Sequence, residues 1–144
     1  MDELGKLKVT GVTLLSTDEY QINKEFIIPL GLKWWLRSPS SDLSDLVGTV
    51  YENGRVYYTV TDVDTCYVRP VLKCDLEALG IKPGEKLKIK NQKYIALIGN
   101  YLLKLECICN SAFRLDYEAD DANIYDASDI KKIVETWYQL EFSK

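Results

Sequence analysis

The sequence predicts an α+β fold: an irregular antiparallel sheet of short strands and hairpins, accompanied by two helices. Short apolar–polar alternations bounded by turn residues indicate the strands, and two segments with helix-start signals indicate the helices. The chain has 144 residues, so we expect residues 1–144 to form a single domain. Apolar residues make up 47% of the chain, an ordinary share for a globular domain that excludes a disordered protein.

The N-terminal third contains the first expected strands and the first helix. Residues 7–15 predict a strand that Gly11 interrupts. Residues 16–19, Ser-Thr-Asp-Glu, have the capping-box pattern, in which Ser and Glu each bond to the backbone N–H of the other, and so predict the start of a short helix. Residues 33–37 are a second expected strand, and residues 38–45, rich in Ser and Asp, are an expected loop.

A β-hairpin is the clearest local prediction. Residues 46–51 and 55–61 flank an Asn-Gly turn, whose two residues tolerate positive φ. Tyr57 and Tyr58 lie on the second strand. If they are exposed, they favour a binding surface, because tyrosine offers contact area at low entropic cost. The alternative is that they fill half-buried strand faces.

The second half continues with short strands and ends in a helix. Residues 67–73 predict a strand, residues 87–90 and 94–98 a hairpin turning at Asn91-Gln92, and residues 101–108 another strand. Ser128 is the expected N-cap of a C-terminal helix of about a dozen residues. Its apolar face would hold Ile130, Ile133, Val134, Trp137 and either Tyr138 or Leu140.

Charge and missing residue types exclude several functions. With 18 basic and 22 acidic residues the net charge is −4, so we do not expect direct nucleic-acid binding. The chain has no histidine, which excludes histidine-based catalysis and histidine-ligated zinc. No apolar run is long enough for a membrane helix, and the acidic start lacks the regions of a signal peptide, so we expect a cytoplasmic protein. Its four cysteines lack zinc-ribbon spacing and are expected to be reduced core residues.

Two sequence blocks carry a resemblance. Residues 34–39, Trp-Trp-Leu-Arg-Ser-Pro, and residues 68–72, Val-Arg-Pro-Val-Leu, resemble the WWLRSP and VRPAL signatures of a bacterial and phage family of unknown function. The lead-in at residues 14–20 is similar as well. The resemblance implies a remote relation to the superfold of C-type lectins and formylglycine-generating enzymes, an irregular antiparallel sheet flanked by two helices.

The two halves of the resemblance stand in reversed order. Residues 86–142 resemble the half that precedes the WWLRSP half in that family, whereas here they follow residues 12–74. The chain is therefore expected to be a circular permutant, or else to exchange halves with a second copy. Residues 73–86 are long enough to cross a small domain, which favours a monomer over a half-swapped homodimer.

Trp35, Arg37 and Arg69 are candidate site residues within these blocks. They could form an aromatic and guanidinium pocket for a ligand. Alternatively, each arginine pairs with a carboxylate or with carbonyls and stacks on a tryptophan to hold the loops. The resemblance favours internal contacts of the second kind.

An acidic stretch is the remaining candidate surface. Asp116, Glu118, Asp120 and Asp121 precede the last helix and could dock on a basic partner, although such loops are commonly just solvated. The spacing does not fit a calcium loop, so we expect no metal and no cofactor. Nearby lysines at positions 86, 88 and 90 would protect an edge hairpin.

The sequence therefore predicts a non-enzymatic protein- or ligand-binding module, associated with a phage or mobile element and acting in the cytoplasm of a bacterial host cell. A protein partner is the expected one. The alternative is a small acidic phage inhibitor of a bacterial defence nuclease, comparable to anti-CRISPR proteins, that masks a nucleic-acid-binding surface. An enzyme is disfavoured because no catalytic constellation is visible.

Overall fold

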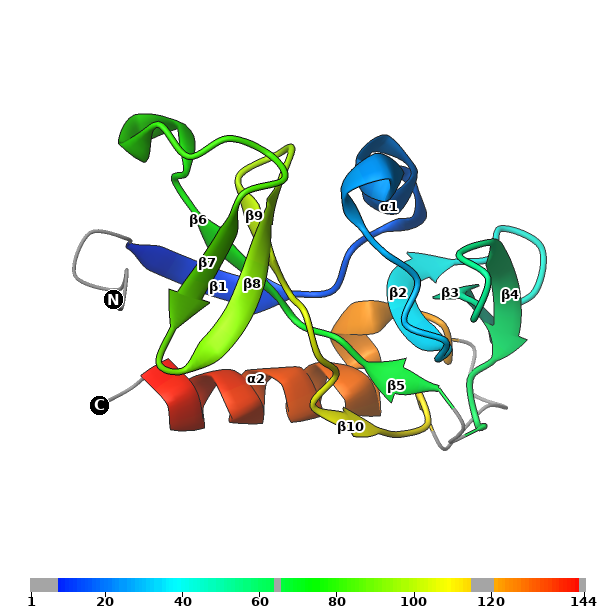
Figure 1. The fold of residues 1–144 in the computed structure, drawn as a ribbon. Helices are drawn as coiled ribbons and strands as arrows, with labels where there is room; N and C mark the ends of the chain where they lie inside the picture. Colours follow the sequence, from blue (N-terminus) through cyan, green and yellow to red (C-terminus); the bar gives the residue numbers. More distant parts are fainter. Residues whose placement is uncertain (1–7, 64–65, 115–120, 143–144) are drawn as a thin grey trace.

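A computed structural model describes residues 8–63, 66–114 and 121–142, and it confirms the α+β class (Figure 1). The described strands form two five-stranded sheets rather than one. The first sheet has the spatial order β1 (Val9–Thr13), β6 (Val71–Cys74), β9 (Tyr101–Lys104), β8 (Gln92–Leu97) and β7 (Lys86–Ile89). The second has the order β10 (Cys109–Asn110), β5 (Tyr67–Val68), β2 (Trp34–Pro39), β3 (Leu46–Val50) and β4 (Val56–Val60).

The prediction of a single strand over residues 67–73 is wrong. Arg69 and Pro70 separate β5 from β6, which belong to different sheets. Pro70 has no N–H to donate to a strand ladder, so the chain leaves one sheet here and enters the other. The expected strand over residues 101–108 is likewise too long: it ends at Lys104, and the chain returns to the second sheet as β10.

One pair of strands also departs from the expected antiparallel arrangement. Trp34 of β2 pairs in parallel with Tyr67 of β5, whereas the strands of the first sheet all pair antiparallel. Residues 12–74 and 86–142 share both sheets within one chain, since β6 pairs with β9 and β5 with β10. The permutation inferred from the resemblance stays a prediction.

Both expected hairpins are present, and their turns differ from the expectation. In the β3–β4 hairpin only Gly54 adopts a positive φ, at 86°, while Asn53 does not. The reason is that the loop contains three residues, closed by a bond from the N–H of Tyr51 to the carbonyl of Arg55 at 2.8 Å. The β7–β8 hairpin turns one residue earlier than predicted. Lys90 and Asn91 have φ values of 50° and 67°, the pattern of a type I′ turn.

The helices begin where the sequence predicts. At the start of α1 (Thr17–Asn23), the Glu19 N–H donates to Ser16 Oγ at 3.1 Å and the Ser16 N–H donates to Glu19 Oε1 at 2.9 Å. The N–H of Lys131 donates to Ser128 Oγ at 3.0 Å, which caps α2 (Asp129–Phe142). The described residues also contain short 3-10 turns: η2 (Lys24–Phe26), η3 (Glu77–Leu79) and η4 (Tyr125–Ala127).

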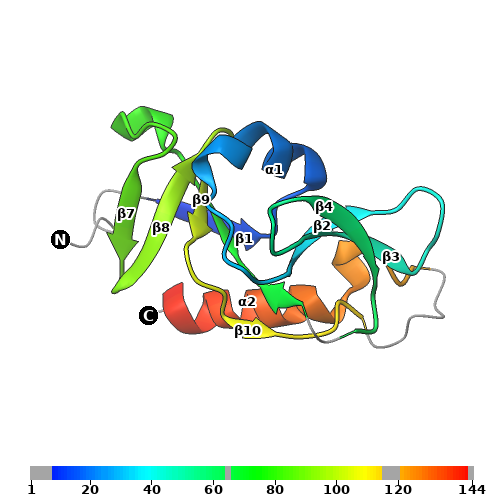
Figure 2. The same ribbon diagram turned by 45° about the vertical axis from the view of Figure 1, so that its right-hand side comes forward.

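The two helices join the two sheets. Figures 1 and 2 show α1 between the sheets on one side and α2 running along the other. Ile130 and Val134, in the first half of α2, pack with Trp35 of the second sheet. Trp137 and Phe142, in its second half, pack against residues of the first sheet and are only partly buried. A single apolar helix face therefore closes the core beneath both sheets.

Two further expectations concern cysteines and membranes. Cys66 and Cys74 are buried, Cys107 and Cys109 are half-buried, and none of the four forms a disulfide. Within the described ranges, no helix has both the length and the apolar character that crossing a lipid bilayer requires.

Candidate functional site

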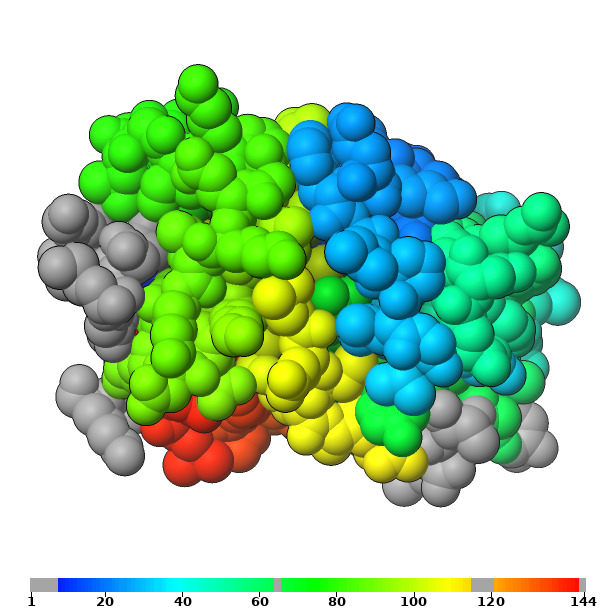
Figure 3. Space-filling model, in the orientation of Figure 1, coloured from blue at the N-terminus to red at the C-terminus, as the bar shows by residue number. Residues whose placement is uncertain are grey.

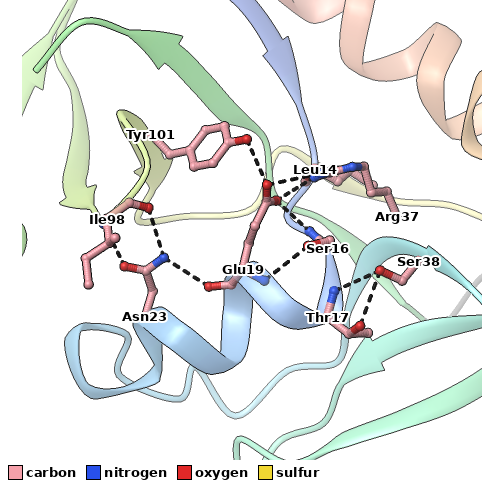
Figure 4. A network of polar contacts seen from close by, with 9 residues as sticks. All are labelled: Leu14, Ser16, Thr17, Glu19, Asn23, Arg37, Ser38, Ile98 and Tyr101. Atoms are coloured by element: carbon pink, nitrogen blue, oxygen red, sulfur yellow. Dashed lines mark hydrogen bonds and ion pairs between the residues drawn. The ribbon is translucent and has the colours of Figure 1, made fainter.

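A polar network around Glu19 ties α1 to both sheets (Figure 4). Arg37 of β2 donates from Nη1 to Glu19 Oε1 at 2.6 Å and from Nη2 to Glu19 Oε2 at 3.1 Å. The hydroxyl of Tyr101 on β9 donates to the same Oε2 at 2.8 Å. Arg37 Nη1 also donates to the carbonyl of Leu14. The guanidinium of Arg37 is thus occupied by partners within the chain.

This arrangement shifts the pKa of Glu19 strongly. Burial alone would raise that pKa, but the hydrogen bonds from Arg37, the Ser16 N–H and Tyr101 outweigh it and lower the pKa from its ordinary value of 4.5 to about 2. The same pairing raises the pKa of Arg37 although burial opposes its charge. The pair is therefore ionised at neutral pH and serves as a structural link.

Asn23 extends the network in a way that sequence reasoning missed. Its Nδ2 donates to the carbonyls of Glu19 at 2.9 Å and Ile98 at 3.3 Å, while its Oδ1 accepts from the Ile98 N–H at 2.7 Å (Figure 4). Ser38 Oγ accepts from the Thr17 N–H at 2.9 Å. A lone Asn at the end of a short helix gives no sequence signal for such long-range contacts.

Trp35 and Arg69 lie inside the protein. Trp35 is fully buried, and its Nε1 donates to the carbonyl of Ser111 at 2.8 Å. Arg69 is only 2% exposed and lies over the ring of Trp34, 4.8 Å from its centroid. These are internal contacts of the kind that the second interpretation predicts. A ligand would reach either side chain only after a change in the surrounding structure.

Arg69 fixes the start of the segment that leads from β9 to β10. Its Nε donates to the carbonyl of Lys104 at 2.7 Å, and its Nη2 donates to the carbonyl of Leu105 at 3.2 Å. Burial lowers the pKa of Arg69 to about 10, which still leaves the group charged at neutral pH. The arginine therefore holds the backbone at Lys104 and Leu105, where this segment begins.

A groove separates this segment from residues 28–32. Its volume is about 350 Å³, within the lower range of ligand-binding pockets. In Figure 3 the light-blue and yellow segments that border it meet on the front face. Glu106 supplies the charge in the lining. Most of the other lining groups are apolar or thiol side chains: Leu30, Leu32, Leu105, Ile108, Cys107 and Cys109.

The sequence contained a signal for this groove. Residues 27–32, Ile-Ile-Pro-Leu-Gly-Leu, are a run of apolar residues with Pro and Gly that fits no strand pattern. The structure leaves Ile28 74% exposed, and Leu30 and Leu32 of the same run line the groove. An apolar run that neither helix nor strand can bury marks a candidate surface patch.

The groove thiols are poor nucleophiles. Burial raises the pKa of Cys107, although Arg69 and Lys104 partly oppose the shift. Burial also raises the pKa of Cys109. Because the thiolate is the reactive form of cysteine, the raised pKa values lower the reactivity of both groups.

Tyr57 and Tyr58 lie on β4, at the opposite edge of the second sheet from β10. They are 44% and 47% exposed. Successive strand residues point to opposite faces, so the two rings leave the sheet on different sides. Tyr57 packs against Tyr51, with ring centroids 4.6 Å apart. The structure thus separates this pair from the groove and from Arg37 and Arg69.

Most of the expected acidic surface lies outside the described residues, which include Asp121 but not Asp116, Glu118 or Asp120. Asp121 is exposed and pairs with Arg114 at 2.6 Å. Among the residues that the structure places, no three metal-ligating side chains come together.

Two hollows of about 540 and 480 Å³ lie along β1 and α2, and the smaller one is also lined by Arg37 of β2 and by η4. In the smaller one, Lys131 is 3.4 Å from Asp126 and 4.0 Å from Glu135, so these charges neutralise one another, and Lys73 is a further cation in the lining.

No family model, curated protein or solved structure matches this chain. The likeness built on residues 34–39 and 68–72 therefore stays a prediction, and so does the lectin-like superfold. The candidate site is therefore defined by geometry alone. It is an exposed apolar groove, and Arg69 hydrogen-bonds to the backbone of the segment that forms one of its walls.

Proposed function

We propose that this chain is a non-enzymatic protein-binding module whose partner places apolar side chains in the groove between residues 28–32 and 105–109. The exposed apolar surface at the groove carries the proposal. Ile28, Leu30 and Leu32 are all exposed on one short segment. Contiguous exposed apolar side chains of this kind mark interaction surfaces in proteins.

The extent of this surface supports a protein partner rather than a small ligand. Ile28, two positions before Leu30, is exposed and lies outside the groove lining, so this short segment exposes apolar side chains in addition to those in the groove. Glu106 at the groove and the nearby Lys33 and Glu52 supply a polar border. An apolar centre with a polar rim is the usual composition of a protein–protein interface.

The chemistry of the groove supports binding rather than catalysis. The chain has no histidine, and burial raises the pKa of the Cys107 and Cys109 thiols. A thiol nucleophile is usually activated by a lowered pKa, and the shifts of these two thiols have the opposite direction.

The WWLRSP resemblance adds to this proposal an association with phages or mobile elements in a bacterial cytoplasm. The alternative, an inhibitor that masks the nucleic-acid-binding surface of a defence nuclease, depends on the acidic residues Asp116, Glu118 and Asp120. Because these lie outside the described residues, the groove rather than the acidic stretch carries the proposal. Both functions require a protein partner and neither requires direct binding of nucleic acid.

Affinity capture from a bacterial lysate with matched variants tests the proposal. The wild-type chain is compared with Leu32→Asp in the groove and with Leu79→Asp on η3, which is exposed to a similar degree. Proteins identified by mass spectrometry should be retained by the wild type and by Leu79→Asp and lost from Leu32→Asp. A partner that all three chains retain, or the absence of any specific partner, contradicts the proposal.

A further inference from the structure

The outer strand of the second sheet, β4, presents an unused backbone edge. The hairpin is closed by a bond from the Tyr51 N–H to the Arg55 carbonyl and ends with one from the Thr61 N–H to the Asp45 carbonyl at 2.9 Å. Hydrogen-bonded residues alternate along an antiparallel pair, so residues 55, 57, 59 and 61 turn their backbone groups toward β3. Residues 56, 58 and 60 turn theirs outward.

These outward groups have almost no partners among the described residues. The carbonyl of Val60 accepts one long bond, from the Val63 N–H at 3.5 Å. The outward N–H and carbonyl groups of Val56 and Tyr58 accept or donate no bond within that part of the chain. In Figures 1 and 3, β4 lies at the margin of the molecule, where another strand can approach it.

The other sheet edges carry features that discourage strand pairing. β7 exposes Lys86 and Lys88, β10 has only two residues, and the register of β1 shifts between Val9 and Gly11. Charged residues, short strands and bulges are the usual protection of sheet edges. β4 has none of these: its sequence is Val-Tyr-Tyr-Thr-Val, and its register is regular.

The sequence of β4 is close to symmetric about Tyr58. In an antiparallel pair of two copies centred on Tyr58, Val56 of each copy faces Val60 of the other, and Tyr57 faces Thr59. The outward N–H and carbonyl groups of the three residues 56, 58 and 60 then pair across a two-fold axis. Such an interface is self-complementary, as the symmetry of a homodimer requires.

We propose that the β4 edge binds a second copy of this chain, antiparallel and centred on Tyr58, to form one continuous sheet across a two-fold axis. This dimer differs from a half-swapped one, because each copy keeps its own complete fold. It replaces the monomer that the length of residues 73–86 favoured. The surface is separate from the groove of the proposed function, at the other edge of the same sheet.

Sedimentation equilibrium of the full chain, from about 1 μM to about 1 mM, tests the dimer, since interfaces of limited area associate weakly. Tyr58→Pro removes an outward N–H without breaking a bond to β3 and should abolish the dimer. Ile98→Lys, at an exposed position in the first sheet's turn, is the control for a surface change and should leave the dimer intact.

A charge within the paired strand provides the sharper measurement. Val60→Lys, at an exposed position, should weaken the dimer by about tenfold, because it places a charge opposite Val56 of the other copy. A chain that stays monomeric throughout, or a dimer indifferent to Tyr58→Pro and to Val60→Lys, overturns the proposal. Leu32→Asp should leave the dimer unchanged, so failure of the groove and failure of the dimer are distinguishable.

Discussion

The β7–β8 hairpin and the β3–β4 hairpin each supply the outer strand of a five-stranded sheet, and they finish that edge differently. β7 alternates exposed lysines with partly or fully buried apolar residues, whereas β4 exposes two tyrosines and carries no charge. The turns differ too, with two positive-φ residues at Lys90 and Asn91 and one at Gly54. The comparison shows that hairpin geometry alone does not determine whether an outer strand can pair with a further strand. The outward side chains of that strand determine it.

Replacement of Trp34, a buried aromatic residue in the same core cluster as residues of both hairpins, has the largest expected effect. Trp34 is buried between Arg69 and Tyr20, whose ring meets it edge-on at 5.6 Å. Trp34→Ala should lower the free energy of unfolding by about 3–5 kcal/mol in urea denaturation, because it empties a fully packed site. Trp137→Ala, at a partly buried position, is the control and should cost clearly less. Equal losses would show that the core does not lie where we describe it.

The link between the two sheets through Glu19 has the next largest effect. The pKa of Glu19 is depressed to about 2, so its contribution to stability is present above its ordinary pKa of 4.5 and is lost as the pH falls toward 2. Glu19→Gln should cost about 1–2 kcal/mol at pH 7, after allowance for solvent screening of this partly exposed pair. Urea denaturation at several pH values should show the difference between the two proteins shrinking below pH 4.5. A difference that is independent of pH contradicts the ionised link.

The contrast between the two turns predicts a smaller, asymmetric effect. Gly54→Ala should destabilise the protein by about 1–2 kcal/mol, because Gly54 has a positive φ and a new Cβ would lie 3.3 Å from Pro29. Asn91→Gly should change stability by less than about 0.5 kcal/mol, because Asn already tolerates this conformation. Thermal unfolding of both variants measures this difference in stability, and similar shifts in Tm would contradict the prediction.

Exchange of side chains between the two edges should affect stability least and association most. Replacing Lys86 and Lys88 by tyrosine should change the free energy of unfolding by less than about 0.5 kcal/mol, since both positions are exposed. It should nevertheless produce concentration-dependent association in light scattering, because the edge loses its charges. Lys82→Tyr, outside the strand, is the matched control. If the edge variant stays as dispersed as the control, lysines do not protect β7.

Local features of the fold could be predicted from the sequence, and long-range ones could not. The helix caps and hairpins depend on residues close together, such as Ser16 with Glu19, and these were confirmed apart from the details of the two turns. The division into two sheets depends on where the chain turns at Arg69-Pro70 and on the parallel pairing of Trp34 with Tyr67, contacts that no local pattern specifies.

The candidate site was predicted only in part. The sequence left two roles open for Arg69, and only the structure shows that it holds the carbonyls of Lys104 and Leu105. The groove itself was missed, because its walls come from segments more than seventy positions apart, although the apolar run 27–32 was visible. Tyr57 and Tyr58 were identified from composition, and their exposure favours the binding surface over a half-buried face.

The crossing at Arg69-Pro70 has a consequence for how the molecule comes apart. Residues 67–74 supply a strand to each sheet, and β6 is paired on both sides, by β1 and β9. If residues 67–74 detach from one sheet, the other sheet therefore loses its strand from this stretch as well. We expect heat to unfold the protein in one calorimetric transition and the slowest amide hydrogens of both sheets to exchange at a common rate. Since Val9 must find Cys74 across half the chain, we also expect folding to be slow for a domain of this size.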